Sequence, residues 1–198
     1  GHMCYLSRIA ATLTTCGRHP AIDYGNNPKC IVMWACNPLW TNPDEYKGAS
    51  FWQAYENGAK LICIDPRKSF YAGKADLWLQ VRPGTDIALM LGWIRLVIEE
   101  DLYDHDFVAN WTVGFDDLKE AAASYTLEKV SQITSVPADL IAQAARMYAT
   151  RKPAVIPFGL GLDKQGVNAT QSARGRAILR AITGNLEIPG GENFSTAG

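Results

Sequence analysis

The sequence lacks the spacings that define several common classes of site. Five cysteines occur in 198 residues, none of them spaced Cys-x-x-Cys, and the three histidines do not cluster beside them. This pattern argues against a structural zinc site. An odd number of cysteines also argues against a disulfide framework. We expect Cys30, Cys36 and Cys63 to be small buried hydrophobic residues.

An excess of one charge and long apolar runs are missing as well. The net charge is −1, with both signs spread along the chain, so there is neither a basic stripe for nucleic acid nor an acidic tail. The longest apolar stretch, about residues 87–98, contains Gly92 and Arg95 and is too short to span a bilayer. No signal peptide is visible. We expect no nucleic-acid partner and no direct membrane insertion, and the compartment stays open between prokaryotic cytoplasm and periplasm.

Glycine-rich nucleotide fingerprints are absent too. The first apolar run is followed by Cys36-Asn37-Pro38 rather than by Gly-x-Gly-x-x-Gly, which argues against a nicotinamide-dependent dehydrogenase. Gly159 and Gly161 occur later, but the next glycine is at 166 and the spacing is wrong. No Gly-x-x-x-x-Gly-Lys-Ser/Thr segment is present, so GTP hydrolysis is not expected.

What the sequence does contain is an alternation of buried strands and helices. Hydrophobic residues make up 47% of the chain, enough for one sizeable domain. We predict strands at 29–36, 59–64, 75–81 and 153–158, a loop at 159–166, and helices at 5–15, 43–57, 85–100, 104–110, 116–123, 137–150 and 170–183. Such alternation is typical of an α/β fold with a doubly wound, mostly parallel, Rossmann-like sheet. Residues 1–28 form a lead-in segment and 29–198 the α/β core of one domain.

Polar residues follow the predicted strands, where ligands bind on such sheets. Asp65 can accept hydrogen bonds from ribose hydroxyls, and Arg67 can offer its planar fork to a phosphate. Asp86 can accept from the two adjacent donors of guanine. Each residue also has a structural explanation: Asp65 can cap the turn at Pro66, Arg67 can be a solvated side chain, and Asp86 can stabilise the first turn of a helix.

Taken together, the motifs resemble one family in the right order over nearly the whole chain. The segments that carry the likeness to the molybdopterin oxidoreductases of the dimethyl sulfoxide reductase family are 32–38, 58–67, 82–86, 184–185 and 189–191. The first of them is similar to a Trp-Gly-x-Asn-Pro motif, and this sequence departs from it at Ala35, where the family usually has glycine.

The resemblance implies one of two related α/β domains, each holding one guanosine arm of a bis(molybdopterin guanine dinucleotide) cofactor with molybdenum or tungsten. It implies contacts to the guanosine and pyrophosphate from Asn37, Asp65, Arg67 and Asp86, with Pro83 and Gly84 in the same segment. It implies that the loop 159–164 approaches the pterin, through Gly159, Leu160, Gly161 and Lys164. Gly184 and Asn185 either lie near it or form a helix C-cap.

By the same resemblance, Cys4 is the candidate protein ligand to the metal. It lies 33 residues before Asn37, and a thiolate suits a soft metal centre. The segment 4–8 is similar to the ligand segments of the formate dehydrogenase and polysulfide or thiosulfate reductase branches, which makes Arg8 a candidate catalytic cation on the substrate or cofactor side. The alternative is a terminal cysteine beside a tag remnant at 1–3.

The expected function is therefore that of one domain of a molybdenum-dependent oxidoreductase that carries out two-electron redox chemistry or oxygen-atom transfer. We expect the chain to be a fragment that is inactive alone, with an iron–sulfur cluster in the missing part of the parent chain. Expected partners are the remaining domains of the parent subunit and an electron-transfer iron–sulfur subunit. The alternatives are a nicotinamide-dependent dehydrogenase domain and a non-enzymatic nucleotide-binding module.

Overall fold

A parallel four-stranded sheet forms the centre of the computed structural model, which describes residues 6–41, 47–164 and 168–194. The strands are β2 (Cys30–Trp34), β3 (Lys60–Ile64), β4 (Leu77–Leu79) and β5 (Ala154–Val155), in the spatial order β4-β3-β2-β5. Every neighbouring pair is parallel, and β2 lies in register with β3 from Cys30 opposite Lys60 to Trp34 opposite Ile64. The predicted α/β class with a parallel sheet is confirmed.

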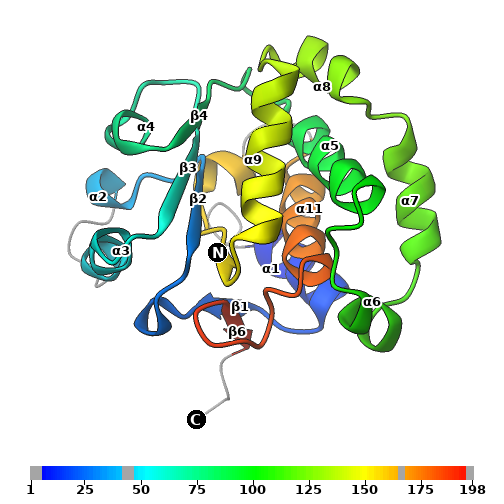
Figure 1. Cartoon of the computed structure of the whole chain (residues 1–198), viewed down its shortest axis with the longest axis horizontal. Coiled ribbons are helices and arrows are strands. Elements are labelled where there is room, and N and C mark those ends of the chain that lie inside the picture. The colour runs from blue at the N-terminus through cyan, green and yellow to red at the C-terminus, as the bar shows by residue number, and fades with distance from the viewer. Residues whose placement is uncertain (1–5, 42–46, 165–167, 195–198) are drawn as a thin grey trace.

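Helices cover both faces of this sheet, which explains why its strands are continuous apolar runs. On one face lie α5 (Asp86–Glu99), α9 (Ala138–Thr150) and α11 (Ala169–Ile182), and on the other lie α3 (Lys47–Glu56) and α4 (Phe70–Lys74) (Figure 1). Because side chains alternate along a strand, Val32 and Trp34 pack into the hydrophobic core under α5, α9 and α11. Ile31 and Met33 pack into the separate core under α3 and α4. Both cores are therefore built on β2.

Three shorter helices, α6 (His105–Trp111), α7 (Phe115–Ala123) and α8 (Leu127–Thr134), lie on the outer side of α5 (Figure 1). Asp104 caps α6 by accepting a hydrogen bond from the Phe107 N–H at 2.8 Å, and Thr126 caps α8 through the Lys129 N–H at 3.2 Å. The predictions for α6, α7 and α9 agree with the structure within one residue, but α8 was not predicted as a separate helix.

Several predicted bounds differ from the structure. The strands expected at 29–36 and 75–81 are the shorter β2 and β4. The strand expected at 153–158 is limited to the two residues of β5, since Pro157 cannot donate to a ladder. The segment expected to be a loop at 159–166 contains the helix α10 (Leu160–Lys164), and 165–167 lie outside the described residues. Within the described ranges, no helix has the length and apolar composition needed to cross a membrane.

The lead-in segment packs onto the core rather than standing apart from it. Helix α1 (Leu6–Cys16) lies alongside α11, and β1 (Pro20–Ile22) pairs antiparallel with β6 (Glu192–Phe194) (Figure 1). The short elements η1 (Tyr24–Asn26) and α2 (Pro38–Thr41) complete the described structure. The β1–β6 pairing joins the first and last described parts of the chain.

Candidate cofactor-binding site

Backbone hydrogen bonds align the turns that follow β2, β3 and β4. The Ala35 N–H donates to the Ile64 carbonyl at 2.9 Å, and the Asp65 N–H donates to the Leu79 carbonyl at 3.3 Å. Because the three strands are parallel, the residues that follow them lie at one edge of the sheet. The structure thus brings Asn37, Asp65 and Arg67 to the same edge.

Asp65 presents a largely buried carboxylate at this edge, 7% exposed. Its Oδ1 accepts from the Arg67 N–H at 2.8 Å, and Arg67 Nε lies 3.8 Å from the same oxygen. Among the described residues, no hydrogen bond engages Asp65 Oδ2. The Arg67 side chain is 78% exposed. Asp65 therefore caps its own turn with one oxygen and keeps the other for a donor, while Arg67 is able to reach an anion.

Asp86 lies at the same edge because it is tied to the end of β2. It begins α5, and its Oδ1 accepts a hydrogen bond from Trp34 Nε1 at 2.8 Å. Burial raises the pKa of the Asp86 carboxyl, and the Trp34 hydrogen bond opposes that rise. Sequence reasoning identified Asp86 but missed Trp34, because a tryptophan inside an apolar strand looks like a core residue alone.

Asn37 adds an unsatisfied acceptor. Its backbone carbonyl accepts from the Trp40 and Thr41 N–H groups and so begins α2. Its side-chain Oδ1 is buried and has no hydrogen-bond partner among the described residues. Buried acceptors without partners are rare in native folds. An orphaned oxygen at the same edge of the sheet as Asp65 and Asp86 fits a ligand that supplies N–H or O–H donors.

The turn after β5 approaches the turn after β2 closely, and two glycines permit it. Ala35 has a φ of 48°, in the left-handed region that favours glycine. A Cβ at Gly159 would collide with the backbone of Ala35, and a Cβ at Gly161 would lie 2.9 Å from the Ala35 Cβ. Leu160 is 55% exposed, and Lys164 is half-buried. The predicted pterin loop therefore reaches the edge that carries Asn37.

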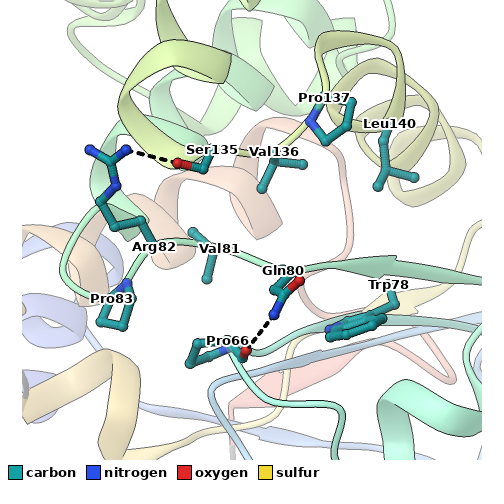
Figure 2. A pocket seen from close by; sticks show the side chains of 10 residues that line it. All are labelled: Pro66, Trp78, Gln80, Val81, Arg82, Pro83, Ser135, Val136, Pro137 and Leu140. Carbon is teal, nitrogen blue, oxygen red and sulfur yellow. Dashed lines mark hydrogen bonds between the residues drawn. The ribbon is translucent and has the colours of Figure 1, made fainter.

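A hollow of about 480 Å³ borders the site on the β4 side. Pro83, in the exposed turn before α5, lines it, and Gly84 follows with a φ of 82°. Arg82 Nη2 donates to Ser135 Oγ at 2.8 Å, and Figure 2 shows this bond at one end of the hollow. The lining residues are Pro66, Trp78, Gln80, Val81, Arg82, Pro83, Ser135, Val136, Pro137 and Leu140. Since Pro66 belongs to the Asp65 turn, the hollow is continuous with it.

Gly184 and Asn185 lie at the opposite, amino-terminal end of the sheet. Asn185 is fully buried; its Oδ1 accepts from the Ala154 N–H at 2.8 Å, and its Nδ2 donates to Thr183 Oγ at 2.8 Å. Ala154 begins β5 opposite Cys30, which begins β2. Gly184 has a φ of 66° and packs against Asp104. The structure does not bring these two residues to the Asp65 edge, and it supports their alternative role of ending α11.

A buried ionic cluster holds the turn after β5. Arg176 Nη2 lies 3.0 Å from Asp163 Oδ1, and Arg180 Nη2 lies 2.9 Å from Glu192 Oε2, with all four side chains fully buried. Glu192 Oε1 also accepts from the Ile156 N–H at 2.9 Å. Burial lowers the pKa of Arg176 to about 10, although the negative charge of Asp163 opposes this shift. Burial raises the pKa of Glu192, opposed by Arg180.

Phe158 lies at the centre of this cluster. The guanidinium carbons of Arg8 and Arg176 lie 4.5 Å from its ring centroid and that of Arg180 lies at 5.5 Å, while His19 stacks on the ring at 4.4 Å. Arg8 Nη1 is also 3.7 Å from Asp163 Oδ2. The structure thus places Arg8 in a packing cluster.

Sequence reasoning missed the other members of the cluster. The available signal was two arginines spaced i, i+4 on an otherwise apolar face of α11. Cys4, the candidate metal ligand, lies outside the described residues. Cys30 and Cys63 are buried as predicted, and burial raises the pKa of each to about 12. Cys36 is only half-buried, and its Sγ donates to the Phe158 carbonyl at 2.9 Å.

Comparisons with a family model, with protein sequences and with solved structures all find similar proteins. A family model described as molybdopterin oxidoreductase matches residues 19–196. The chain is 48% identical over 133 residues to acetylene hydratase of Syntrophotalea acetylenica, covering 67% of this chain and 18% of that protein. It is 39% identical over 171 residues to formate dehydrogenase H of Escherichia coli, covering 85% and 23%. The solved acetylene hydratase from Pelobacter acetylenicus superposes with a TM-score of 0.91 at 37% identity, covering 98% of this chain and 26% of that chain.

The chain therefore spans between about a fifth and a quarter of the length of these relatives. The family match extends from the lead-in segment to the β6 region and includes every residue of the sheet edge described above. By sequence and by fold, the chain belongs to the molybdopterin oxidoreductase family.

Proposed function

We propose that the edge defined by Asn37, Asp65, Arg67 and Asp86 binds the guanosine and pyrophosphate of a guanine dinucleotide form of the molybdopterin cofactor. The observation that carries the proposal is the position of two carboxylates at one end of the sheet: Asp65 directly follows β3, and Asp86 is hydrogen-bonded to Trp34 at the end of the adjacent parallel strand β2. Family membership supports a molybdenum- or tungsten-dependent oxidoreductase over the nicotinamide and non-enzymatic alternatives.

The donors and acceptors at the edge match that group. The unengaged oxygen of Asp65 suits ribose hydroxyls, and the exposed Arg67 fork suits a phosphate. The second oxygen of Asp86 suits the adjacent N–H donors of guanine, which adenine does not present in the same arrangement. The orphaned Asn37 Oδ1 supplies a further acceptor.

The remaining residues would orient the group. When bound, the cofactor would supply two-electron redox chemistry, with or without oxygen-atom transfer. Gly159, Leu160, Gly161 and Lys164 would approach its pterin from the turn after β5, which the ionic cluster holds in place. Cys4 would be the protein ligand to the metal. Its thiolate chemistry supports this assignment.

We further propose that the chain is one domain of a longer subunit and is inactive alone. The relatives, which are almost four times as long as this chain, support this view. An iron–sulfur cluster, a second dinucleotide domain and an electron-transfer iron–sulfur subunit would complete the enzyme. The relatives act on different compounds according to their names, so we assign no substrate.

The cofactor content of the longer subunit tests the proposal. We expect purified protein to contain molybdenum or tungsten and to release GMP on acid hydrolysis. Asp65→Asn should lower the GMP content, whereas Asp139→Asn, an exposed acid in the first turn of α9, should leave it unchanged. Metal without any guanine nucleotide, or equal GMP content in both variants, would contradict the assignment of this edge.

A further inference from the structure

The Trp34 indole joins the end of β2 to the start of α5. Its Nε1 donates to Asp86 Oδ1 at 2.8 Å, and its ring packs against Trp93 with the ring centroids 5.3 Å apart. Asp86 and Trp93 are seven residues apart in sequence, so they lie on the same face of α5. Trp34 is fully buried, and its backbone pairs with Ile64 of β3. The indole N–H therefore holds Asp86 Oδ1 at a fixed position.

The bond from Trp34 also favours the ionised form of Asp86. Burial raises the pKa of the Asp86 carboxyl, and hydrogen bonds from Trp34 and from its own backbone N–H oppose that rise. Among the described residues, no charged side chain contributes to this shift. Charged side chains on the helices packed against α5, which are α7, α8, α9 and α11, are exposed, apart from Arg176 and Arg180, which pair with Asp163 and Glu192. Trp34 is thus the neighbouring side chain that keeps Asp86 ionised.

The protonation state of Asp86 decides which base it is able to bind. An ionised carboxylate offers acceptors alone, which match the adjacent N1–H and amino donors of guanine. A protonated carboxyl offers one donor and one acceptor, and that pair matches N1 and the amino group of adenine. Because Trp34 holds Oδ1, rotation of the carboxylate is restricted as well.

We propose that Trp34 sets the base selectivity of the sheet edge by holding Asp86 as an ionised acceptor in one orientation. This inference rests on the proposed function, in which Asp86 contacts guanine. Trp34 is a positioning residue, because it is buried within β2 and acts through Asp86. A hydrogen bond to a charged group is worth about tenfold or more in an equilibrium constant, so its loss should move the titration of Asp86 upward by about one pH unit.

Replacing Trp34 by phenylalanine removes the donor and keeps an aromatic ring. Trp93→Phe is the matched control, because Trp93 is fully buried in the same core, yet its Nε1 has no hydrogen-bond partner in the described parts of the chain. The carboxyl carbon of Asp86 is titrated by NMR in each ligand-free chain. We expect its midpoint to be about one pH unit higher in Trp34→Phe than in the wild type, and unchanged in Trp93→Phe. Equal midpoints in all three proteins would overturn the proposal.

Nucleotide titrations measure the selectivity itself. At a pH between the wild-type and Trp34→Phe midpoints, the ratio of GDP affinity to ADP affinity should be at least about threefold lower in Trp34→Phe than in Trp93→Phe. Ionisation of the phosphates cancels in this ratio, since both nucleotides carry the same diphosphate. An equal ratio in the two variants would contradict the role of Trp34.

One readout needs no substitution and so remains informative if Trp34→Phe does not fold. In the wild-type chain, the indole N–H resonance of Trp34 should shift with the titration of Asp86, whereas that of Trp93 should stay constant. A Trp34 resonance that does not respond would overturn the proposal. Failure of GDP to bind the wild-type chain would refute the proposed function instead, and GDP binding with equal Asp86 midpoints would refute the role of Trp34 alone.

Discussion

The buried pair of Arg180 and Glu192 makes a quantitative prediction for Arg180→Met. Both side chains are fully buried, and the pair is closed at 2.9 Å between Nη2 and Oε2. Methionine fills much of the volume of the arginine stem but provides no charge. Glu192 would then keep only the Ile156 N–H at 2.9 Å and the more distant field of Arg176. A carboxylate would remain buried without its ion-pair partner.

Removing one partner of a buried ion pair costs about 3–5 kcal/mol. For a domain of this size, each kcal/mol lowers Tm by about 2–4 °C, so we expect a fall of about 6–20 °C. Urea unfolding at pH 7 with a tryptophan fluorescence readout measures the change in unfolding free energy. Arg174→Met, on the exposed side of the same helix, is the matched control and should change that free energy by less than about 0.5 kcal/mol.

The pH dependence has a definite sign. Burial already raises the pKa of Glu192, and loss of Arg180 removes the main opposing interaction. A carboxyl with a raised pKa in the folded state favours folding most when protonated, so the deficit of Arg180→Met should shrink as pH falls below 7. Adding Glu192→Gln, which keeps an acceptor for Ile156, should recover most of the loss at pH 7. A deficit below about 1 kcal/mol that does not change with pH would refute this reasoning.

Three further predictions concern the sheet edge. Asp86→Asn should raise the unfolding free energy of the ligand-free chain at pH 7, because burial raises the pKa of the Asp86 carboxyl. The gain should vanish below pH 3.8, the ordinary pKa of an aspartate, where that carboxyl is protonated in both states. Urea titrations at several pH values measure the unfolding free energy. Ala35→Gly should raise the unfolding free energy by up to about 1 kcal/mol, because φ is 48° at this position, whereas Ala35→Val should lower it. A urea midpoint that is lower for the glycine variant than for the valine variant would contradict this prediction. Gly159→Ala should lower Tm and shift the amide resonances of the turn after β2, because its Cβ would meet the Ala35 backbone; unchanged spectra would show that the two turns do not touch.

The elements with strong local signals were predictable from sequence. The apolar run ending at Asn37-Pro38 defined β2, and Asp65-Pro66 defined the end of β3. Both signals combine a buried strand with a residue that stops it. The sequence showed only that Ala35 stands where the related motif has glycine, and the structure adds that its φ is 48°, in the region that favours glycine.

Features that depend on distant parts of the chain were not predictable. The pairing of β1 with β6 joins segments about 170 residues apart and leaves no local pattern. Arg176 and Arg180 of α11 are fully buried, and their partners Asp163 and Glu192 come from other elements, so the pattern of α11 alone does not identify the ion pairs. Gly184 and Asn185 form one of the segments that resemble the family, but the direction of α11 takes them to the other end of the sheet.

Nucleotide selectivity at the sheet edge is the most direct test of the central claim. Isotopically labelled chain is titrated with GDP and with ADP, and backbone amide shifts are followed by NMR. We expect GDP to perturb the amides of Asn37, Asp65, Arg67 and Asp86. GDP should also bind at least about tenfold more tightly than ADP, because adenine cannot make the charged hydrogen bonds to Asp86 that guanine makes. Equal affinities, or shifts confined to the amino-terminal end around Asn185, would contradict a guanosine site at this edge.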